Sequence, residues 1–361
     1  MITETKIEDY ERLSKYLDGL MEKPKLRNIF LELTDKCNLN CAHCGSGCTK
    51  SNSNFLDTGT AIKMLEDVAK RYDPMDIRIC ITGGEPLLHS DVLHIIEKAH
   101  GLGFSTGMTT NGTLIDDRLA RCLAASGLDT IAISIDGLPS QHDIFRCSEG
   151  SFRKAVSGIK ALRKYGMSAQ VTTVVNKGNI GSLESIYLML KDLGIESWVL
   201  VNVDPIGRAK GRSMLLNAEE LNKMYSFVRD KRFDESVELE VLTACSHFQG
   251  MEFERETRDH YFQCWAGTRI AGIRANGDIV ACLDIEKRPE LTQGNIYKDD
   301  FIFVWENKYG QFRKNRALES EMCKKCKYAK MCRGDSAHTW DYDKNEPNYC
   351  IMKLKEENLH A

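Results

Sequence analysis

The chain has 361 residues, of which 42% are hydrophobic and 28% are charged, so it can bury a large core in one large domain or two moderate ones. Forty-nine basic against 52 acidic side chains leave a formal net charge of −3. This balance provides no overall positive field, which argues against nucleic acid or an anionic membrane surface as a partner.

The N-terminal segment, residues 1–26, mixes charged side chains with scattered apolar ones and predicts an amphipathic helix. It lacks the apolar core and the cleavage site of a signal peptide. No stretch of the chain approaches the roughly 18 consecutive apolar residues of a membrane span. The sequence therefore predicts a cytoplasmic protein, in which the 14 cysteines are expected to bind metal rather than to form disulfides.

Six apolar, β-rich runs alternate with segments of helical periodicity after this helix. The expected strands are Ile29–Leu33, Ile77–Ile81, Phe104–Met108, Thr130–Ile135, Val171–Val175 and Trp198–Val203. Six βα units in succession predict an α/β fold over residues 27–235, with a parallel sheet that is either open or curled toward a barrel.

The pattern changes near residue 235. We expect residues 236–258 to bridge to a smaller cysteine-rich module of residues 259–361. Within that module, Arg269–Arg274 and Asp278–Cys282 predict a β-hairpin around Asn276-Gly277, a dipeptide that favours a type I′ turn.

Three cysteines with the spacing CxxxCxxC, Cys37, Cys41 and Cys44, follow the first expected strand. Three thiolates can hold three irons of a four-iron cluster and leave the fourth iron open. A structural zinc site is the alternative, although a zinc ribbon usually has two distant CxxC pairs and the next CxxC begins only at Cys323. The spacing alone leaves both metals open.

Polar motifs also follow the next three expected strands. Gly83–Pro86 (GGEP) comes after the second strand, Thr109–Gly112 after the third, and Ser134 and Asp136 close the fourth. Each motif alone is no more than a turn or a solvated acid. Because the carboxyl ends of parallel strands meet at one mouth, their joint placement predicts that they converge with the three cysteines on one cavity.

The CxxxCxxC loop, the GGEP motif and the strand-end polar residues resemble the radical S-adenosylmethionine (SAM) superfamily over residues of about 27 to 225. The resemblance implies a partial (βα)6 TIM-like barrel with a [4Fe–4S] cluster whose open iron binds SAM. Reductive cleavage of SAM would then give a 5′-deoxyadenosyl radical that abstracts hydrogen from a substrate carbon. His43 departs from the family, in which the residue before the third cysteine is often aromatic; we expect this to change packing without removing a ligand.

The resemblance also assigns residues to SAM. The expected cofactor-binding residues are Gly83, Gly84, Glu85, Asn111, Ser134 and Arg146. Glu85, reached through two glycines that permit close backbone approach, would accept from the SAM ammonium group. Arg146 would bind the SAM carboxylate bidentately, whereas Ser134 and Asn111 would contact the ribose or the carboxylate.

The C-terminal cysteines resemble the SPASM extension of the superfamily, which carries auxiliary iron–sulfur clusters. The expected ligands are Cys264, Cys282, Cys323, Cys326, Cys332 and Cys350. The last four would supply four thiolates to one closed cluster, with zinc as the alternative metal.

Ser336 stands where the SPASM pattern has a further cysteine, so a first auxiliary cluster would keep only Cys264 and Cys282 from the motif. Cys245 is a candidate third ligand, with Asp335, Ser336 or substrate completing the shell. Alternatively, this chain would hold a single auxiliary cluster on Cys264, Cys282, Cys323 and Cys326, as in the shortened "twitch" relatives. We expect one auxiliary cluster at least.

Two residues are candidates for catalysis. Cys147, next to Arg146, is a candidate hydrogen donor to a substrate radical, and Asp284, two residues after Cys282, is a candidate proton acceptor in an oxidation. A buried thiol and a salt-bridged surface carboxylate are the respective alternatives. Cys48 fits no ligand spacing and is interpreted as a buried thiol.

SPASM relatives mostly act on ribosomally made peptides or proteins, so the resemblance implies oxidation, cross-linking or epimerisation of such a substrate with electrons from a flavodoxin or ferredoxin. Only about 26 residues precede the first strand, so a separate leader-peptide-binding protein or recognition by the barrel mouth is expected. The alternatives are a dehydrogenase or epimerase of a sugar or aminocyclitol, and a non-catalytic iron–sulfur electron carrier. A carrier fits poorly because it needs no GGEP motif.

Overall fold

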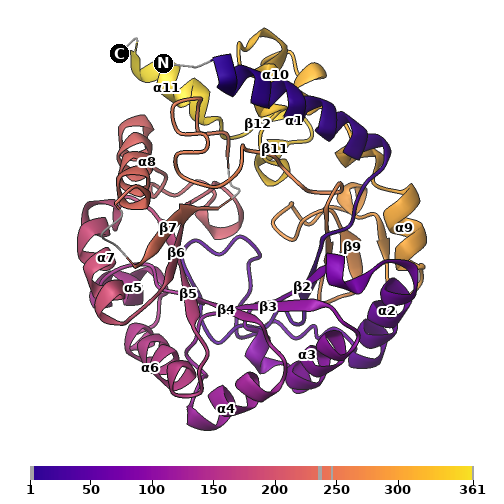
Figure 1. Ribbon diagram of the computed structural model, residues 1–361, viewed down its shortest axis with the longest axis vertical. Coiled ribbons are helices and arrows are strands. Elements are labelled where there is room, and N and C mark those ends of the chain that lie inside the picture. The colour runs from indigo at the N-terminus through magenta and orange to yellow at the C-terminus, as the bar shows by residue number, and fades with distance from the viewer. Residues whose placement is uncertain (1–3, 235–237, 245–246, 360–361) are drawn as a thin grey trace.

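The computed structural model describes residues 4–234, 238–244 and 247–359, in which a curved sheet of ten strands is bordered by helices on its outer side (Figure 1). The strands of this sheet are β1 (Asn28–Glu32), β2 (Arg78–Thr82), β3 (Ser105–Thr110), β4 (Thr130–Ser134), β5 (Ala169–Val175), β6 (Ser197–Asn202), β7 (Glu240–Thr243), β8 (Ile270–Ile273), β9 (Asp278–Val280) and β10 (Gly294–Asn295). Two short strands, β11 (Trp340–Asp341) and β12 (Glu346–Pro347), form a separate pair.

Eleven α-helices accompany these strands in the described residues. They are α1 (Glu4–Glu22), α2 (Thr58–Arg71), α3 (Val92–Gly101), α4 (Asp117–Ala125), α5 (Pro139–Phe145), α6 (Ser151–Lys164), α7 (Leu183–Asp192), α8 (Ala218–Arg232), α9 (Phe301–Asn307), α10 (Ala329–Cys332) and α11 (Ile351–Leu359). Among the described residues, no helix has the length and apolar character needed to cross a bilayer.

Strands β1 to β6 lie in chain order and are all parallel, which confirms the predicted partial barrel. Alternate residues of each strand face opposite sides of the sheet. In β5 and β6, Val175 and Leu200 are fully buried, whereas Val174 and Val201 are half-buried and line a cavity on the inner side. Alternate side chains of β5 and β6 therefore pack in the core under the helices, and those between them face the barrel interior.

The sheet extends beyond the six predicted strands at both edges. β7 pairs in parallel with β6, although the sequence pattern assigned its residues to a bridging segment. At the other edge, β8 pairs in parallel with β1 and carries the antiparallel strands β9 and β10. One sheet thus runs from the barrel into the cysteine-rich module, across the predicted boundary.

The predicted hairpin of β8 and β9 is present, but its turn is not the expected type I′ turn. Gly277 has a φ of +85°, whereas Asn276 is absent from the non-glycine residues with positive φ. The amide of Gly277 donates to the carbonyl of Arg274 over 2.8 Å, and the amide of Arg274 donates to the carbonyl of Asp278. Only one left-handed residue is used, as in a three-residue loop that ends in a bulge at glycine.

The N-terminal helix α1 lies against the cysteine-rich module at the top of Figure 1. The buried guanidinium of Arg333, next to Cys332, donates to Asp18 over 2.7 Å and to Ser14 over 3.2 Å. This contact holds the beginning of the chain on the module that contains its end.

Candidate active site at the mouth of the partial barrel

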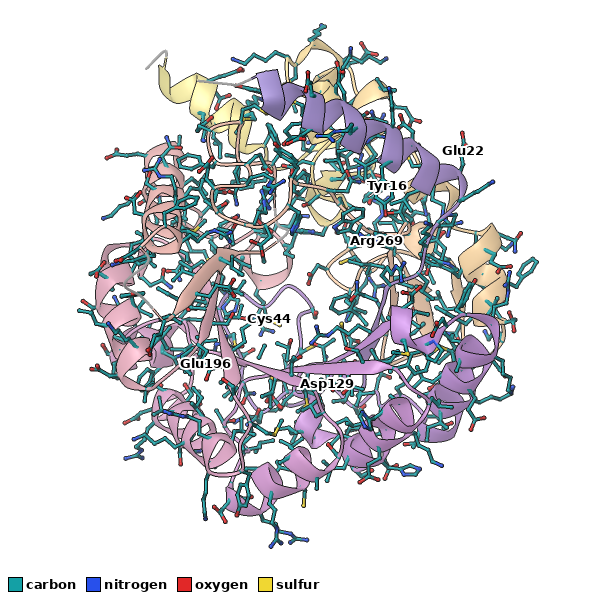
Figure 2. All side chains as sticks on the ribbon, in the orientation of Figure 1. Tyr16, Glu22, Cys44, Asp129, Glu196 and Arg269 are labelled. Atoms are coloured by element: carbon teal, nitrogen blue, oxygen red, sulfur yellow. The ribbon has the colours of Figure 1, made fainter. Side chains whose placement is uncertain are left out.

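The three cysteines of the CxxxCxxC motif lie on the loop that follows β1, with Cys44 near the centre of the ring of strands (Figure 2). Cys37 and Cys41 are buried and Cys44 is half-buried. Burial raises the pKa of Cys37 to about 12 and also raises the pKa of Cys41. Such thiols lose their protons when a metal binds them, so three free thiols on one buried loop fit an iron–sulfur cluster.

A fourth thiol, that of Cys48, touches this group. Its hydrogen bond to Cys44 lowers the pKa of the Cys44 thiol. Cys48 is 2% exposed, as expected for a buried thiol. The sequence pattern did not indicate its contact with a predicted cluster ligand.

Gly83 and Gly84 pack directly on the backbone that precedes Cys37. The amide of Gly84 donates to the carbonyl of Thr34 over 2.6 Å, and the amide of Glu85 donates to the carbonyl of Lys36 over 2.9 Å. A Cβ atom at Gly83 would lie 2.6 Å from the Thr34 oxygen, and one at Gly84 would lie 2.3 Å from the Lys36 oxygen. Only glycine permits this approach, so the GGEP turn positions the start of the cluster loop.

Glu85 is fully buried at the end of β2. Its Oε1 accepts from the Thr110 hydroxyl over 2.6 Å and from the Leu87 amide, and its Oε2 accepts from the Asn111 amide over 2.9 Å. Burial raises the pKa of Glu85. Since a carboxylate accepts about four hydrogen bonds, one lone pair remains for a ligand such as an ammonium group.

Asn111 connects the end of β3 to the cluster loop. Its side-chain amide donates to Asn38 Oδ1 over 2.8 Å, and the Asn38 amide donates to the Thr113 hydroxyl over 2.8 Å. Asn38 directly follows the first cysteine of the motif. Ser134 is half-buried at the end of β4. The predicted convergence of strand ends on the cluster loop is therefore present.

Arg146 lies between the cluster loop and an internal carboxylate. Its Nε donates to Asp136 Oδ2 over 2.5 Å, and its Nη1 is 3.8 Å from the Cys41 sulfur. Burial alone would raise the pKa of Asp136, but the charge and hydrogen bond of Arg146, together with the neighbouring histidines, outweigh burial and the pKa is lowered. A buried ion pair thus fixes Arg146, and the predicted contact with the SAM carboxylate stays a prediction.

The ring of His43, which precedes the third motif cysteine, packs against an aromatic side chain. Its ring stacks on Phe145 with centroids 4.2 Å apart and planes at 10°. Burial lowers the pKa of His43 to about 4, so the ring is neutral near pH 7. Its Nδ1 is buried and has no hydrogen-bond partner within the described ranges. A buried polar atom of this kind needs a hydrogen-bond partner, which a bound group or a water molecule would supply.

Arg208, which the sequence analysis did not single out, holds the cluster loop from outside it. Its Nε donates to the carbonyl of Cys41 over 2.7 Å, its Nη1 to the carbonyl of Cys48 over 2.9 Å, and its backbone amide to the carbonyl of Cys44 over 3.0 Å. Arg208 follows β6 in the same way as the other motifs follow β1 to β4. Its position after an expected strand was the one signal from which the sequence could have predicted a role at the site.

Replacing Arg208 by alanine is expected to lower the free energy of unfolding by about 1–3 kcal/mol, because two carbonyl groups lose a charged donor. The loosened loop should also lose iron faster. Urea unfolding and the iron retained after desalting measure both effects. Arg212→Ala, at an exposed position four residues away, is the control. Equal stability and iron retention in the two variants would contradict the assigned role.

A cavity of about 300 Å³ lies between the cluster loop and the cysteine-rich module. Its lining includes His43, Gly45, Val174, Val201, Asp204, Ile206, Cys264, Trp265, Cys282, Asp284, Ser336 and His338. The amide of Ala337 donates to the sulfur of Cys264 over 3.4 Å, so Ser336 and Cys264 share one wall. Cys245 lies outside the described residues.

The other four cysteines of the module line a separate pocket of about 430 Å³. They are Cys323, Cys326, Cys332 and Cys350. Burial raises the pKa of Cys332, and it raises that of Cys350 to about 12. The structure thus brings together the predicted four-thiolate set. The four cysteines of the twitch-type alternative are instead divided between two pockets.

The two candidate catalytic residues lie in different places. Asp284 lines the cavity next to the cluster loop, where a Cβ atom at Gly45 would be 3.7 Å from its Oδ1. Cys147 is exposed, has a φ of +51° after the end of α5, and does not belong to the described lining of the cavity. Both catalytic roles stay predictions.

Comparisons with known proteins agree with this geometry. The radical SAM superfamily model matches residues 31–190, and the SPASM model, an iron–sulfur cluster-binding domain, matches residues 264–327. The AdoMet-dependent heme synthase of Methanosarcina barkeri is 30% identical over 91% of this chain and 97% of its own length. The antilisterial bacteriocin subtilosin biosynthesis protein AlbA of Bacillus subtilis is 27% identical over 88% of this chain and 68% of its own length.

Among solved structures, native anSMEcpe with bound AdoMet superposes with a TM-score of 0.73 at 20% identity, covering 93% of this chain and 96% of that one. This likeness concerns the fold, including the partial barrel and the module that follows it. The chain therefore belongs to the radical SAM superfamily and carries a SPASM-type iron–sulfur module.

Proposed function

We propose that this radical SAM enzyme abstracts hydrogen from a residue of a peptide or protein that enters the cavity between the cluster loop and the SPASM-type module. The observation that carries the proposal is the cavity of about 300 Å³, which has His43 and Gly45 on one side and Cys264 and Cys282 on the other. Ligand pockets usually measure about 300–1,000 Å³, so this cavity lies at the lower end of the range and can take a side chain of such a substrate.

When bound, the reduced cluster and SAM supply a 5′-deoxyadenosyl radical. The chain's own residues prepare the site. Cys37, Cys41 and Cys44 would hold the cluster. The remaining lone pair of Glu85 would accept from the SAM ammonium group, and Arg146 would meet the SAM carboxylate. Apolar side chains of the cavity lining would exclude water from the reacting carbon.

The SPASM-type module would act in electron transfer. Its four-cysteine pocket fits one closed auxiliary cluster, and Cys264 and Cys282 would belong to a second site at the cavity wall. Radical SAM cleavage needs a reductant, for which a flavodoxin or a ferredoxin is suitable. Asp284, at the cavity wall, would take the proton if the substrate is oxidised.

Modification of a tetrapyrrole side chain is the second candidate. It is favoured by the Methanosarcina barkeri heme synthase, which matches this chain over 97% of its own length. AlbA, by contrast, is named for the biosynthesis of a bacteriocin, subtilosin. The two candidates differ in the size and chemistry of the substrate that reaches the cavity.

The test uses anaerobically reconstituted enzyme with dithionite and SAM. One arm contains peptides encoded by short reading frames beside the gene, and the other contains an iron porphyrin with propionate side chains. We expect a peptide-dependent mass change or deuterium uptake from heavy water, together with 5′-deoxyadenosine. Modification of the porphyrin alone would overturn the peptide proposal in favour of the second candidate. Formation of 5′-deoxyadenosine with neither substrate changed would contradict both.

A further inference from the structure

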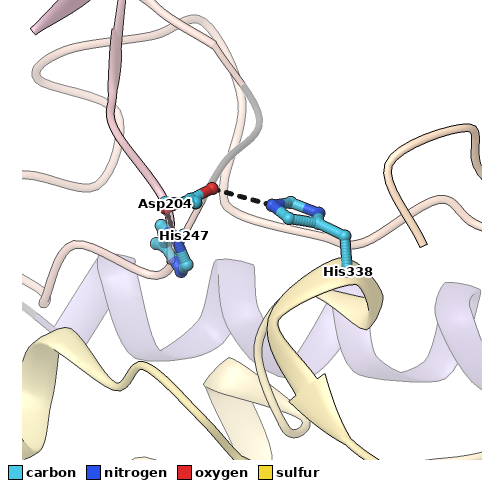
Figure 3. Close-up of side chains that lie close together, drawn as sticks. All are labelled: Asp204, His247 and His338. Carbon is cyan, nitrogen blue, oxygen red and sulfur yellow. Dashed lines mark hydrogen bonds and ion pairs between the residues drawn. The ribbon is translucent and has the colours of Figure 1, made fainter. Parts of the chain in front are cut away.

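Two histidines and one carboxylate meet at the edge of the cavity, in a group that the radical chemistry described above does not use (Figure 3). Asp204 Oδ2 lies 2.8 Å from His338 Nε2, and Asp204 Oδ1 lies 2.8 Å from His247 Nε2. The three ligand atoms all lie within 4.8 Å of one another.

Three distant segments supply these side chains. Asp204 follows β6, His247 follows β7, and His338 belongs to a short turn of the SPASM-type module. The ring of His247 is fully buried, whereas the side chain of His338 is 14% exposed and lines the cavity. The group thus has a buried side and a side that faces the substrate cavity.

His247 is held in the manner of a metal ligand. Its Nδ1 lies 2.9 Å from Asp335 Oδ2, and the other oxygen of Asp335 accepts from the Phe248 amide over 3.1 Å. Histidines that bind metals almost always use their second ring nitrogen in this way, because a carboxylate fixes the ring and raises its basicity. Asn202, which donates to Asp204 Oδ1 over 2.8 Å, orients the carboxylate similarly.

The charges of the group also suit a divalent cation, because the carboxylates of Asp204 and Asp335 both lie against the fully buried ring of His247.

We propose that Asp204, His247 and His338 bind one divalent first-row metal ion whose open coordination position faces the cavity. Metal–nitrogen and metal–oxygen bonds measure about 2.0–2.2 Å, so the donors can separate by at most about 4.4 Å in a shared shell. Small shifts from the present positions satisfy this limit. Two histidines and one carboxylate are the ligand set of catalytic zinc sites and of non-haem ferrous sites.

The open coordination position of this metal would bind an oxygen atom of the substrate. As a Lewis acid it would bind a carbonyl or carboxylate oxygen of the substrate and hold that group beside the cluster loop. Such an oxygen occurs in a peptide and equally in a porphyrin propionate. The metal site therefore does not depend on which substrate class is correct, and it can be tested without substrate.

The experiment measures zinc and iron in the anaerobically reconstituted enzyme after equilibration with buffered Zn²⁺ and gel filtration. We expect about one zinc ion per chain in addition to an unchanged iron content. His338→Gln should remove this zinc while leaving the iron in place. Asp335→Asn keeps all three ligands and should weaken zinc binding by about 10–100-fold.

His94→Gln, at an exposed position on α3, is the matched control and should bind zinc like the unaltered enzyme. The proposal is overturned if the unaltered enzyme binds no zinc beyond that of His338→Gln. It is also overturned if His338→Gln and Asp335→Asn both bind zinc with unchanged affinity. This outcome counts only when the iron contents and circular dichroism spectra of the variants match those of the unaltered enzyme. In either case zinc on cysteine thiols, or no zinc, would explain the data.

Discussion

Replacing Cys41 by alanine is expected to reduce the formation of 5′-deoxyadenosine from SAM by more than roughly 100-fold. Altering a residue that only supports a metal ligand costs up to about 100-fold, and the loss of a ligand itself should cost more. Cys41 is buried on the cluster loop, and its sulfur lies 3.8 Å from Arg146 Nη1. Removing this thiol leaves two motif cysteines for the cluster. The measurement is product formation by the dithionite-reduced enzyme, together with its iron content.

Cys122→Ala provides the matched control for that experiment. Cys122 is a half-buried free cysteine on α4, away from the loop that holds the three motif cysteines. Its variant should bind iron and cleave SAM like the unaltered enzyme. If Cys41→Ala retained the activity of Cys122→Ala, the assignment of the cluster to the CxxxCxxC loop would be wrong.

Replacing Gly84 by alanine is expected to lower the free energy of unfolding by about 2–4 kcal/mol and to remove most of the iron of the barrel cluster. The new Cβ atom would lie 2.3 Å from the carbonyl oxygen of Lys36, which is backbone and has no rotamer by which to move aside. The strand end and the cluster loop must therefore separate. Urea unfolding and iron analysis measure the two effects.

Gly101→Ala is the control for this substitution. Gly101 ends α3, and a Cβ atom there would meet nothing within 4 Å. Because alanine favours a helix more than glycine, this variant should be neutral or more stable by up to about 1 kcal/mol. A Gly84→Ala enzyme that kept both its iron and its stability would show that the close approach of the GGEP turn is not needed.

The sequence predicted strands β1 to β6 well because most of them are apolar runs buried on at least one face. Residues 78–81, for example, belong both to β2 and to the predicted strand Ile77–Ile81. It missed β7, which has four residues and lies in a charged stretch, although buried Leu239 and Val241 alternate there with exposed Glu238 and Glu240. The prediction of a type I′ turn was wrong because the dipeptide Asn276-Gly277 also suits a turn in which glycine alone has a left-handed conformation.

The candidate site was predictable where residues lie at fixed places after strands. Glu85 and Asn111 converge on the cluster loop because parallel strands place their carboxyl ends at one mouth. Contacts across long sequence separations gave no such signal. Arg208 lies 167 residues from Cys41, and His338 lies 134 residues from Asp204, so only the folded chain reveals these pairs.

The central claim is that Cys37, Cys41 and Cys44 leave one iron of a cluster free to bind SAM. Electron paramagnetic resonance of the dithionite-reduced enzyme, with SAM labelled by ¹⁵N in its amino group, tests this claim most directly. We expect SAM to change the spectrum of the reduced cluster and to add a hyperfine coupling from the labelled nitrogen. A fully iron-loaded enzyme whose spectrum is unchanged by SAM and shows no such coupling would contradict the account.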